Sequence, residues 1–242
     1  MSAAGYRLAP VGALLVLLCA TPITVAHLDA ARVSVSQLFL DADVVIIARI
    51  DTVAERRFIL EDKPTVNDVV SATVLSQYKG RDLDTVEFFQ DAHGHAHYTP
   101  GDTAVVFLTE LTGAHRLKQR GLAAGVGFVS DQVRNTEHRV QSTELPDYDW
   151  ILGAYADLAG NTSYTVEQRA SRVKAILLRL LGSNAPDLVE SGLLDWENAG
   201  SGIELAQDEV SRLLALTRDA ARPVDLRLAL LRAMSRKGLA DD

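Results

Sequence analysis

Three of the six histidines lie within one short stretch, Asp91-Ala-His93-Gly-His95-Ala-His97, and imidazole is a common ligand of zinc and copper. If this stretch is extended, alternate side chains share one face, so the aspartate and the three histidines form a stripe. Neighbouring positions in such a stripe lie ~6.6 Å apart, which lets two imidazoles bind one ion. His93 and His97, ~13 Å apart in a straight strand, need a bend to do so. The candidates for a further ligand are Asp91, Glu87, Asp102 and His115.

A second route to a metal site starts at the N-terminus. Cleavage of the chain after Ala26 makes His27 the first residue, and a free amine next to an imidazole is a favoured copper chelate. The alternative for the histidine stretch is a solvated loop with no cofactor, favoured by Gly94 and by the turn residues 99–102. The sequence therefore leaves two predictions open: a zinc or copper site using His93, His95, His97 and His27, or no bound metal.

The common catalytic signatures do not occur in this sequence. There is no GxSxG, no Walker A motif and no GxGxxG. Ser171-x-x-Lys174 has the spacing of a serine acylase but lacks the companion SDN and KTG motifs. We therefore name no catalytic residue and expect a non-enzymatic protein; a metalloenzyme built on the histidine stripe is the alternative.

The first 26 residues predict a cleavable secretory signal. Arg7 supplies a short positive region, and residues 11–20 form an apolar run of ten. Thr24-Val25-Ala26 then places slim side chains at the −3 and −1 positions of a signal-peptidase site. The run is shorter than the about 20 residues that span a bilayer, and Pro22 interrupts it. We expect an exported protein, periplasmic or extracellular, with no stable membrane span; an uncleaved anchor is the alternative.

The composition limits the partners of the mature chain. The formal net charge of −8 becomes −9 on cleavage, because the signal contains one base and no acid. An acidic body lacks the positive surface that grips phosphate backbones, so we expect no nucleic-acid partner. Cys19 is the only cysteine and is lost with the signal, so the mature chain has no disulfide and no thiolate ligand. Its stability must come from burial of its apolar residues.

Residues from His27 to about Asp131 have the pattern of a small β-domain. β-Branched and aromatic runs alternate with turn residues such as 79–82 and 100–102, which is typical of a barrel or sandwich. The five expected strands lie at 44–53, 69–78, 85–90, 103–108 and 122–129. Ser34-x-x-Gln37 has the spacing of a capping box and predicts a short helix before the first strand.

From about Asp149 onward the apolar spacing becomes helical. A helix is expected to begin near Thr165-x-x-Gln168, another capping-box match. Its apolar face is predicted to contain Val173, Ile176, Leu177, Leu180 and Leu181. Pro186 and Pro223 each stand where a new helix is expected to start. A shift of 37 residues superposes these prolines. It also aligns Val173 with Val210, Leu177 with Leu214, Leu193-Leu194 with Leu230-Leu231, and, as conservative matches, Ile176 with Leu213 and Val189 with Leu226. This register indicates two copies of one helical hairpin; coincidence among leucine-rich helices is the alternative.

Four segments in order, DADVVIIARI, ATVLSQYKG, TVEFF and PGDTAVVFL, resemble exported bacterial proteins with a domain like the tissue inhibitors of metalloproteinases. The resemblance covers roughly residues 36–130 and implies an OB-type five-stranded barrel. Those inhibitors present an N-terminal cysteine to a protease zinc, and the mature chain has no cysteine, so the inhibitory activity does not carry over. The helical hairpins resemble HEAT-type repeats.

These observations predict an α+β fold, with a small OB-like five-stranded β-barrel followed by an all-α helical-hairpin region. The predicted divisions are a signal peptide at 1–26, a β-domain at 27–140 and a helical domain at 147–242. Two hairpins are fewer than the three repeats that a solenoid needs, so the helices are also expected to pack on the β-domain. The predicted function is an exported binding module whose partner is another exported protein or an envelope component.

Overall fold

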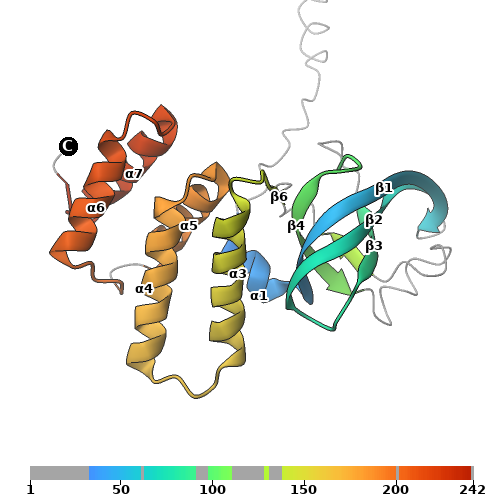
Figure 1. Ribbon diagram of the computed structural model, residues 1–242, viewed down its shortest axis with the longest axis horizontal. Helices are drawn as coiled ribbons and strands as arrows, with labels where there is room; N and C mark the ends of the chain where they lie inside the picture. The colour runs from blue at the N-terminus through green and yellow to red at the C-terminus, as the bar shows by residue number, and fades with distance from the viewer. Residues whose placement is uncertain are drawn as a thin grey trace, which may run out of the picture. The chain divides into compact units, whose positions relative to one another are not determined.

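The computed structural model describes residues 33–60, 63–90, 98–110, 128–130, 138–199 and 202–240. Strands occupy the first half of this part of the chain and helices the second, as expected for an α+β protein (Figure 1). The strands are β1 (Val44–Leu60), β2 (Lys63–Lys79), β3 (Thr85–Gln90), β4 (Thr103–Glu110), β5 (Phe128–Ser130) and β6 (His138–Arg139). The helices are α1 (Val35–Asp41), α3 (Leu145–Gly160), α4 (Val166–Gly182), α5 (Pro186–Asn198), α6 (Gln207–Arg218) and α7 (Val224–Arg236).

The sheet curls so that β1, at one end of the strand order β1-β2-β3-β5-β4-β6, also pairs with β4. Strand β1 is antiparallel to β2 and also to β4, while β2 is antiparallel to β3. The short strand β5 runs parallel to β3 and antiparallel to β4. The pairing with β2 shifts register at three places in β1, between residues 45 and 46, 47 and 48, and 50 and 52. Such irregularities bend a strand and increase its twist, which lets β1 reach both neighbours.

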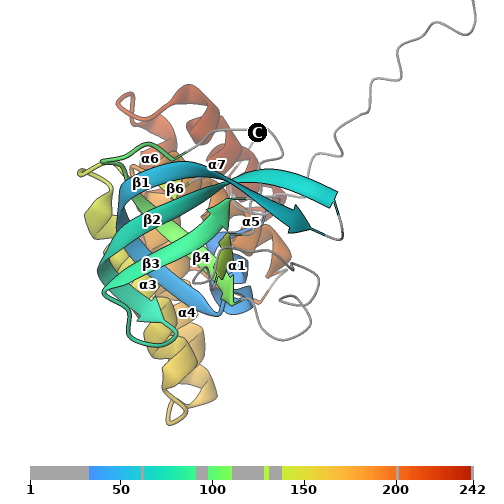
Figure 2. The same ribbon diagram turned by 90° about the vertical axis from the view of Figure 1, so that its right-hand side faces the viewer.

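The strand count corrects the prediction of five. Within the described residues, β1 to β4 are the long strands, and β5 and β6 have three and two residues. Only Phe128 and Val129 of the expected fifth strand fall in β5, and residues 122–127 lie outside the described residues. The first two strands are also longer than expected, because they continue as a hairpin over residues 54–69 (Figure 2). Residues 54–60 pair with residues 63–69, although half of these residues are polar.

Alternate residues of the central strands face two different cores. Ile46, Ala48, Val106 and Leu108 belong to a cluster inside the curled sheet that also includes Phe88 of β3. Their sequence neighbours on the same strands belong to a second cluster, against the helices, and include Val45, Ile47, Val105 and Phe107. Burial on both faces explains why β1 and β4 read as continuous apolar runs rather than as an alternating pattern.

Two helix starts agree with their capping signals. The Ser34 hydroxyl accepts a hydrogen bond from the backbone N–H of Gln37 at the start of α1. The Thr165 hydroxyl accepts from the N–H of Gln168, and the Gln168 side chain accepts in return from the N–H of Thr165. These reciprocal bonds satisfy N–H groups that the first turn of a helix leaves unpaired.

The last four helices form two consecutive pairs, and burial agrees at some of the superposed positions but not at Val173 and Val210, which are 44% and 6% exposed. α4 packs against α5, and α6 packs against α7. Ile176 and Leu213 are buried at equivalent positions of α4 and α6, and so are Val189 and Leu226 on α5 and α7. Pro186 is the first residue of α5, as predicted, whereas Pro223 is the N-cap of α7 and the helix begins at Val224.

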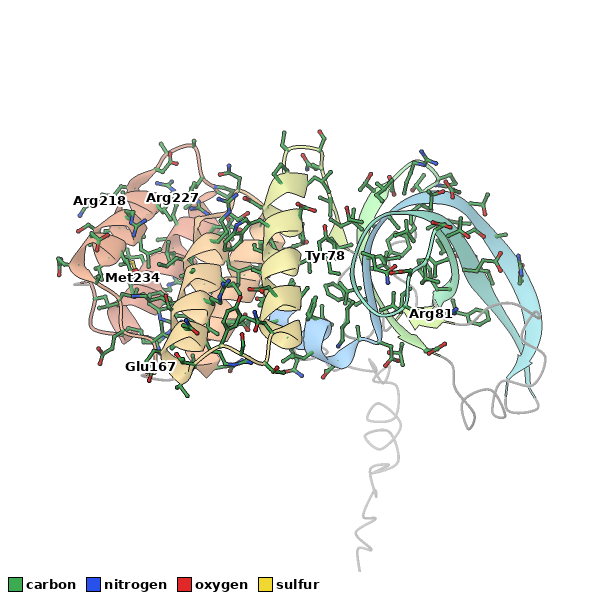
Figure 3. All side chains as sticks on the ribbon, turned by 60° about the horizontal axis from the view of Figure 1, so that its bottom comes forward. Tyr78, Arg81, Glu167, Arg218, Arg227 and Met234 are labelled. Carbon is green, nitrogen blue, oxygen red and sulfur yellow. The ribbon has the colours of Figure 1, made fainter. Side chains whose placement is uncertain are left out.

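The helices also pack on the curled sheet, as expected for so few repeats. One apolar cluster joins α1, β1, β4, α3, α4 and α5. Tyr78 of β2 points toward α3, where its hydroxyl donates to Asp149 over 2.6 Å (Figure 3). The Lys79 ammonium donates to the carbonyl oxygens of Phe39 and Leu40 at the end of α1. Residues 31–242 accordingly form one compact unit.

Candidate functional site

The predicted metal ligands cannot be placed. His93, His95, His97 and His27 all lie outside the described residues, and so do two of the further candidates, Asp91 and His115. Glu87, a third, accepts a hydrogen bond from Ser71 and pairs with Arg56. Among the residues that the structure does describe, no three His, Cys, Asp or Glu side chains come together in a way that could hold an ion. The metal site stays a prediction.

The described part of the chain instead has a cleft between helices that are distant in sequence. Its volume is about 660 Å³, and its walls come from α1, α3, α4, α5 and the connection after α5. Most of the lining is apolar, and it includes Phe39, Tyr155, Leu158, Ile176 and Ile203. Clefts of this size, lined by apolar side chains with few polar groups, are typical of ligand sites.

One face of α4 forms a long wall of this cleft. Arg169, Val173, Ile176, Leu177 and Leu180 all line it, at the three- and four-residue spacing that places side chains on one face of a helix. From Arg169 to Leu180 this wall is about 16 Å long at the rise of an α-helix. Val173 was predicted to be buried with the others, but it is 44% exposed. Val173 lines the cleft, and no helix within the described residues covers its side chain.

The polar part of the cleft is a carboxylate held by two hydroxyls. The Ser36 hydroxyl of α1 donates to Oδ1 of Asp195 on α5 over 2.6 Å. The Tyr155 hydroxyl of α3 lies 3.5 Å from Oδ2 of the same carboxylate. Three helices thus converge on Asp195, and its two oxygens are oriented by neutral donors.

Burial raises the pKa of Tyr155 well above its ordinary value, and the negative charge of Asp195 raises it further. The phenol is therefore neutral at physiological pH and serves as a hydrogen-bond donor. Neither hydroxyl of this group contacts a histidine or lysine among the described residues, and both donate to a carboxylate. The arrangement offers a ligand one carboxylate acceptor whose two oxygens are oriented by these hydroxyls.

Arg169 lies at the other end of the α4 wall and has a structural role. Its guanidinium donates to the carbonyl oxygens of Leu158 and Asn161, over 3.0 and 2.6 Å. These carbonyls lie at the C-terminal end of α3, where a positive charge interacts favourably with the helix dipole. Arg169 therefore fixes the α3–α4 turn that closes this end of the cleft.

Sequence reasoning did not find the cleft residues. Ser36 lies inside a capping pattern that explains the start of α1 without assigning Ser36 a role. Asp195 and Tyr155 belong to no motif that sets them apart from the other polar residues of α5 and α3, and Ser36 is separated from Asp195 by 159 positions. The one available signal was Val173, an apolar residue on the predicted buried face with nothing in the sequence to say what covers it.

A comparison with models of known protein families gives no match, and comparisons with curated proteins and with solved structures give none either. No helix within the described residues is long and apolar enough to cross a membrane. The cleft and the sequence are therefore the basis for assigning a function to this protein.

Proposed function

We propose that this chain is an exported, non-enzymatic binding module that takes an apolar ligand into the cleft between α1, α3, α4 and α5. The observation that carries the proposal is the cleft itself, about 660 Å³ with mostly apolar walls and one oriented carboxylate. Burial of an apolar ligand there gains about 25 cal/mol for each Å² removed from water. The carboxylate and the hydroxyls of Ser36 and Tyr155 supply orientation.

Exposed apolar side chains at the rim support this function. Leu40 is 65% exposed and Val173 is 44% exposed, and both line the cleft. Large apolar side chains gathered at a hollow in the surface are a common mark of a binding site. A ligand bound there would remove the side chains of Leu40 and Val173 from water.

We also propose a specific architecture for the β-domain and for the helices. Strand pairings in the order β1, β2, β3, β5, β4 and back to β1 support a small barrel of the OB type, with β6 as an added bridge. The tissue-inhibitor-like resemblance of residues 36–130 is consistent with that order. The corresponding burial of α4–α5 and α6–α7 supports HEAT-like hairpins. Both architectures commonly present surfaces to partners.

The proposed export of the chain determines the compartment in which its ligand must occur. The signal-like segment 1–26 and the absence of cysteine after it support a periplasmic or extracellular location. We therefore propose that the partner is another exported protein or an envelope component, and that nucleic acid is not a partner of this acidic chain.

The test compares two substitutions on one helix. Val173→Trp fills the cleft from its wall, whereas Val166→Trp, on the same helix and 79% exposed, does not line the cleft. The probe is N-phenyl-1-naphthylamine, an uncharged apolar fluorophore. We expect saturable binding with one site per chain in the unchanged protein and in Val166→Trp. We expect at least about tenfold weaker binding in Val173→Trp, because the indole occupies the volume of the ligand.

The proposal fails if the unchanged protein does not bind the probe saturably, or if both variants bind it equally well. Thermal unfolding of both variants guards against a trivial loss of fold. Val173 and Val166 are both exposed, so neither substitution should change the unfolding temperature by more than a few degrees.

A further inference from the structure

The end of α5 concentrates negative charge at one side of the cleft. Asp195 lies in the last turn of α5, and the next residues that line the cleft are Asn198 and Ala199. The C-terminal end of a helix has a partial negative charge from its unpaired carbonyl groups. The last turn of α5 contains no basic residue of its own, and Arg236 of α7 pairs there with Glu197 rather than with Asp195. The carboxylate and the helix end therefore attract a cation to the same place.

The described neighbours of Asp195 leave its charge uncompensated. Its hydrogen bonds come from the hydroxyls of Ser36 and Tyr155, which are neutral. No ion pair to Asp195 is present among the residues that the structure describes. A partly buried carboxylate is stabilised far more by a cation than by neutral donors. Asp195 is thus suited to pair with a positive group of a ligand.

Arg169 also lines the cleft, and its charge is already used at the end of α3. Its guanidinium donates to the carbonyl oxygens of Leu158 and Asn161, where a cation offsets the partial negative charge of the helix end. No ion pair joins Arg169 to Asp195 within the described part of the chain, where the hydrogen bonds to the carboxylate come from two neutral hydroxyls.

On the basis of the proposed binding function, we propose that the ligand of this cleft is an amphipathic amine, a primary ammonium on an apolar chain. The ammonium pairs with Asp195 and the C-terminal end of α5, and the chain lies along Val173, Ile176 and Leu177 of α4. A primary ammonium has three hydrogen-bond donors, two of which can bond the two carboxylate oxygens of Asp195. The net charge of −8 adds a long-range attraction for cations.

The experiment uses three probes with the same chain and different head groups, octylamine, octanol and octanoate. Calorimetric titration of the purified mature protein from an export-competent host, near neutral pH, measures the affinity for each. We expect octylamine to bind at least about tenfold more tightly than octanol, as one charge-assisted hydrogen bond provides. Octanoate should bind most weakly, because its charge has the same sign as Asp195.

The matched variants are Asp195→Asn and Asp208→Asn. Both remove one negative charge, but Asp208 lies on α6 and pairs with Arg212, and it does not line the cleft. Asparagine at 195 keeps an acceptor for the Ser36 hydroxyl, so the fold should be preserved. We expect Asp195→Asn to abolish the advantage of octylamine over octanol and to leave octanol binding unchanged. Asp208→Asn should bind all three probes as the unchanged protein does.

Several results would overturn this assignment. Tighter binding of octanoate than of octylamine, or equal binding of all three probes, contradicts an ammonium site while leaving the apolar cleft intact. Failure of octanol and of the uncharged fluorophore to bind would contradict the proposed function as well. A trileucine amide that binds more tightly than octylamine, and only with a free N-terminus, would point to a peptide as the occupant instead.

Discussion

The hydroxyl of Ser36 donates to the carboxylate of Asp195 over 2.6 Å, although the two residues lie 159 positions apart. One residue earlier, the backbone N–H of Val35 donates to the buried hydroxyl of Ser191 over 2.7 Å. These two bonds attach the first helix to α5, on which both acceptors lie. The cleft exists because α1 is held there, beside α3 and α4.

Because the Ser191 hydroxyl helps to attach α1 to α5, Ser191→Ala should lower the free energy of unfolding. The substitution leaves the N–H of Val35 buried without an acceptor, and such an unsatisfied donor costs about 1–3 kcal/mol. Urea unfolding should report a loss of this size. The control is Ser211→Ala, whose hydroxyl bonds the carbonyl of Gln207 on an exposed face of α6 and should change stability by less than about 0.5 kcal/mol. Equal effects of the two substitutions would contradict the docking role of Ser191.

Two helical glycines should respond in opposite ways to alanine. A Cβ at Gly192 would lie 2.8 Å from Cβ of Leu180 and 3.2 Å from the backbone N of Leu181, so Gly192→Ala forces α4 and α5 apart. We expect a loss of about 1–3 kcal/mol. A Cβ at Gly153 of α3 meets nothing within 4 Å, and Gly153→Ala should stabilise the protein by about 0.5–1 kcal/mol. Thermal unfolding measures both, and a stabilising Gly192→Ala would show that the helices are not in close contact.

Buried tyrosines predict a loss of stability at alkaline pH. Burial raises the pKa of both Tyr148 and Tyr155 above the ordinary value of about 10. Below that pH both states keep the protons, so these groups cause no change in stability. As the pH rises above about 10, the unfolded chain ionises first, and the free energy of unfolding falls. Urea titrations between pH 8 and pH 12 should show this decline, and it should be shallower in Tyr148→Phe.

One native mass spectrum of this protein tests both the cleavage of the signal segment and the binding of a metal ion. We expect native mass spectrometry of the untagged protein from an export-competent host to give a mass that begins at His27. A mass that retains residues 1–26 would contradict cleavage. An ion that is retained by this species and lost in His93→Ala/His95→Ala would establish the metal site and replace the non-metal description of the protein.

Local signals were sufficient for several elements. The spacing of Ser34 and Gln37, and of Thr165 and Gln168, predicted two helix starts because a cap acts within one turn. The 37-residue repeat was readable because equivalent positions of α4 and α6, such as Ile176 and Leu213, are buried in the same way. The turn after β2 was also predicted, and Gly80 there adopts a φ of +93°, which favours glycine.

Other properties depend on contacts between distant segments. Val173 belongs to the apolar face of α4 by its spacing, yet no helix covers it. Arg222 is one of six arginines between residues 212 and 236, yet it is buried and donates to the carbonyl oxygens of Leu181 and Ser183 at the end of α4. Nothing in the spacing of these residues distinguishes them from their neighbours, because burial is decided by which other element packs there.

The α+β order of elements and the helix caps could be predicted from the sequence, because strand and helix periodicity and capping act over a few residues. The pairing of β1 with both β2 and β4 could not be predicted, because it requires bends that no periodicity encodes. Only the tertiary structure brought Ser36, Tyr155 and Asp195 together at one cleft. A site made of single residues from three helices has no spacing in sequence, because its geometry comes from how those helices pack.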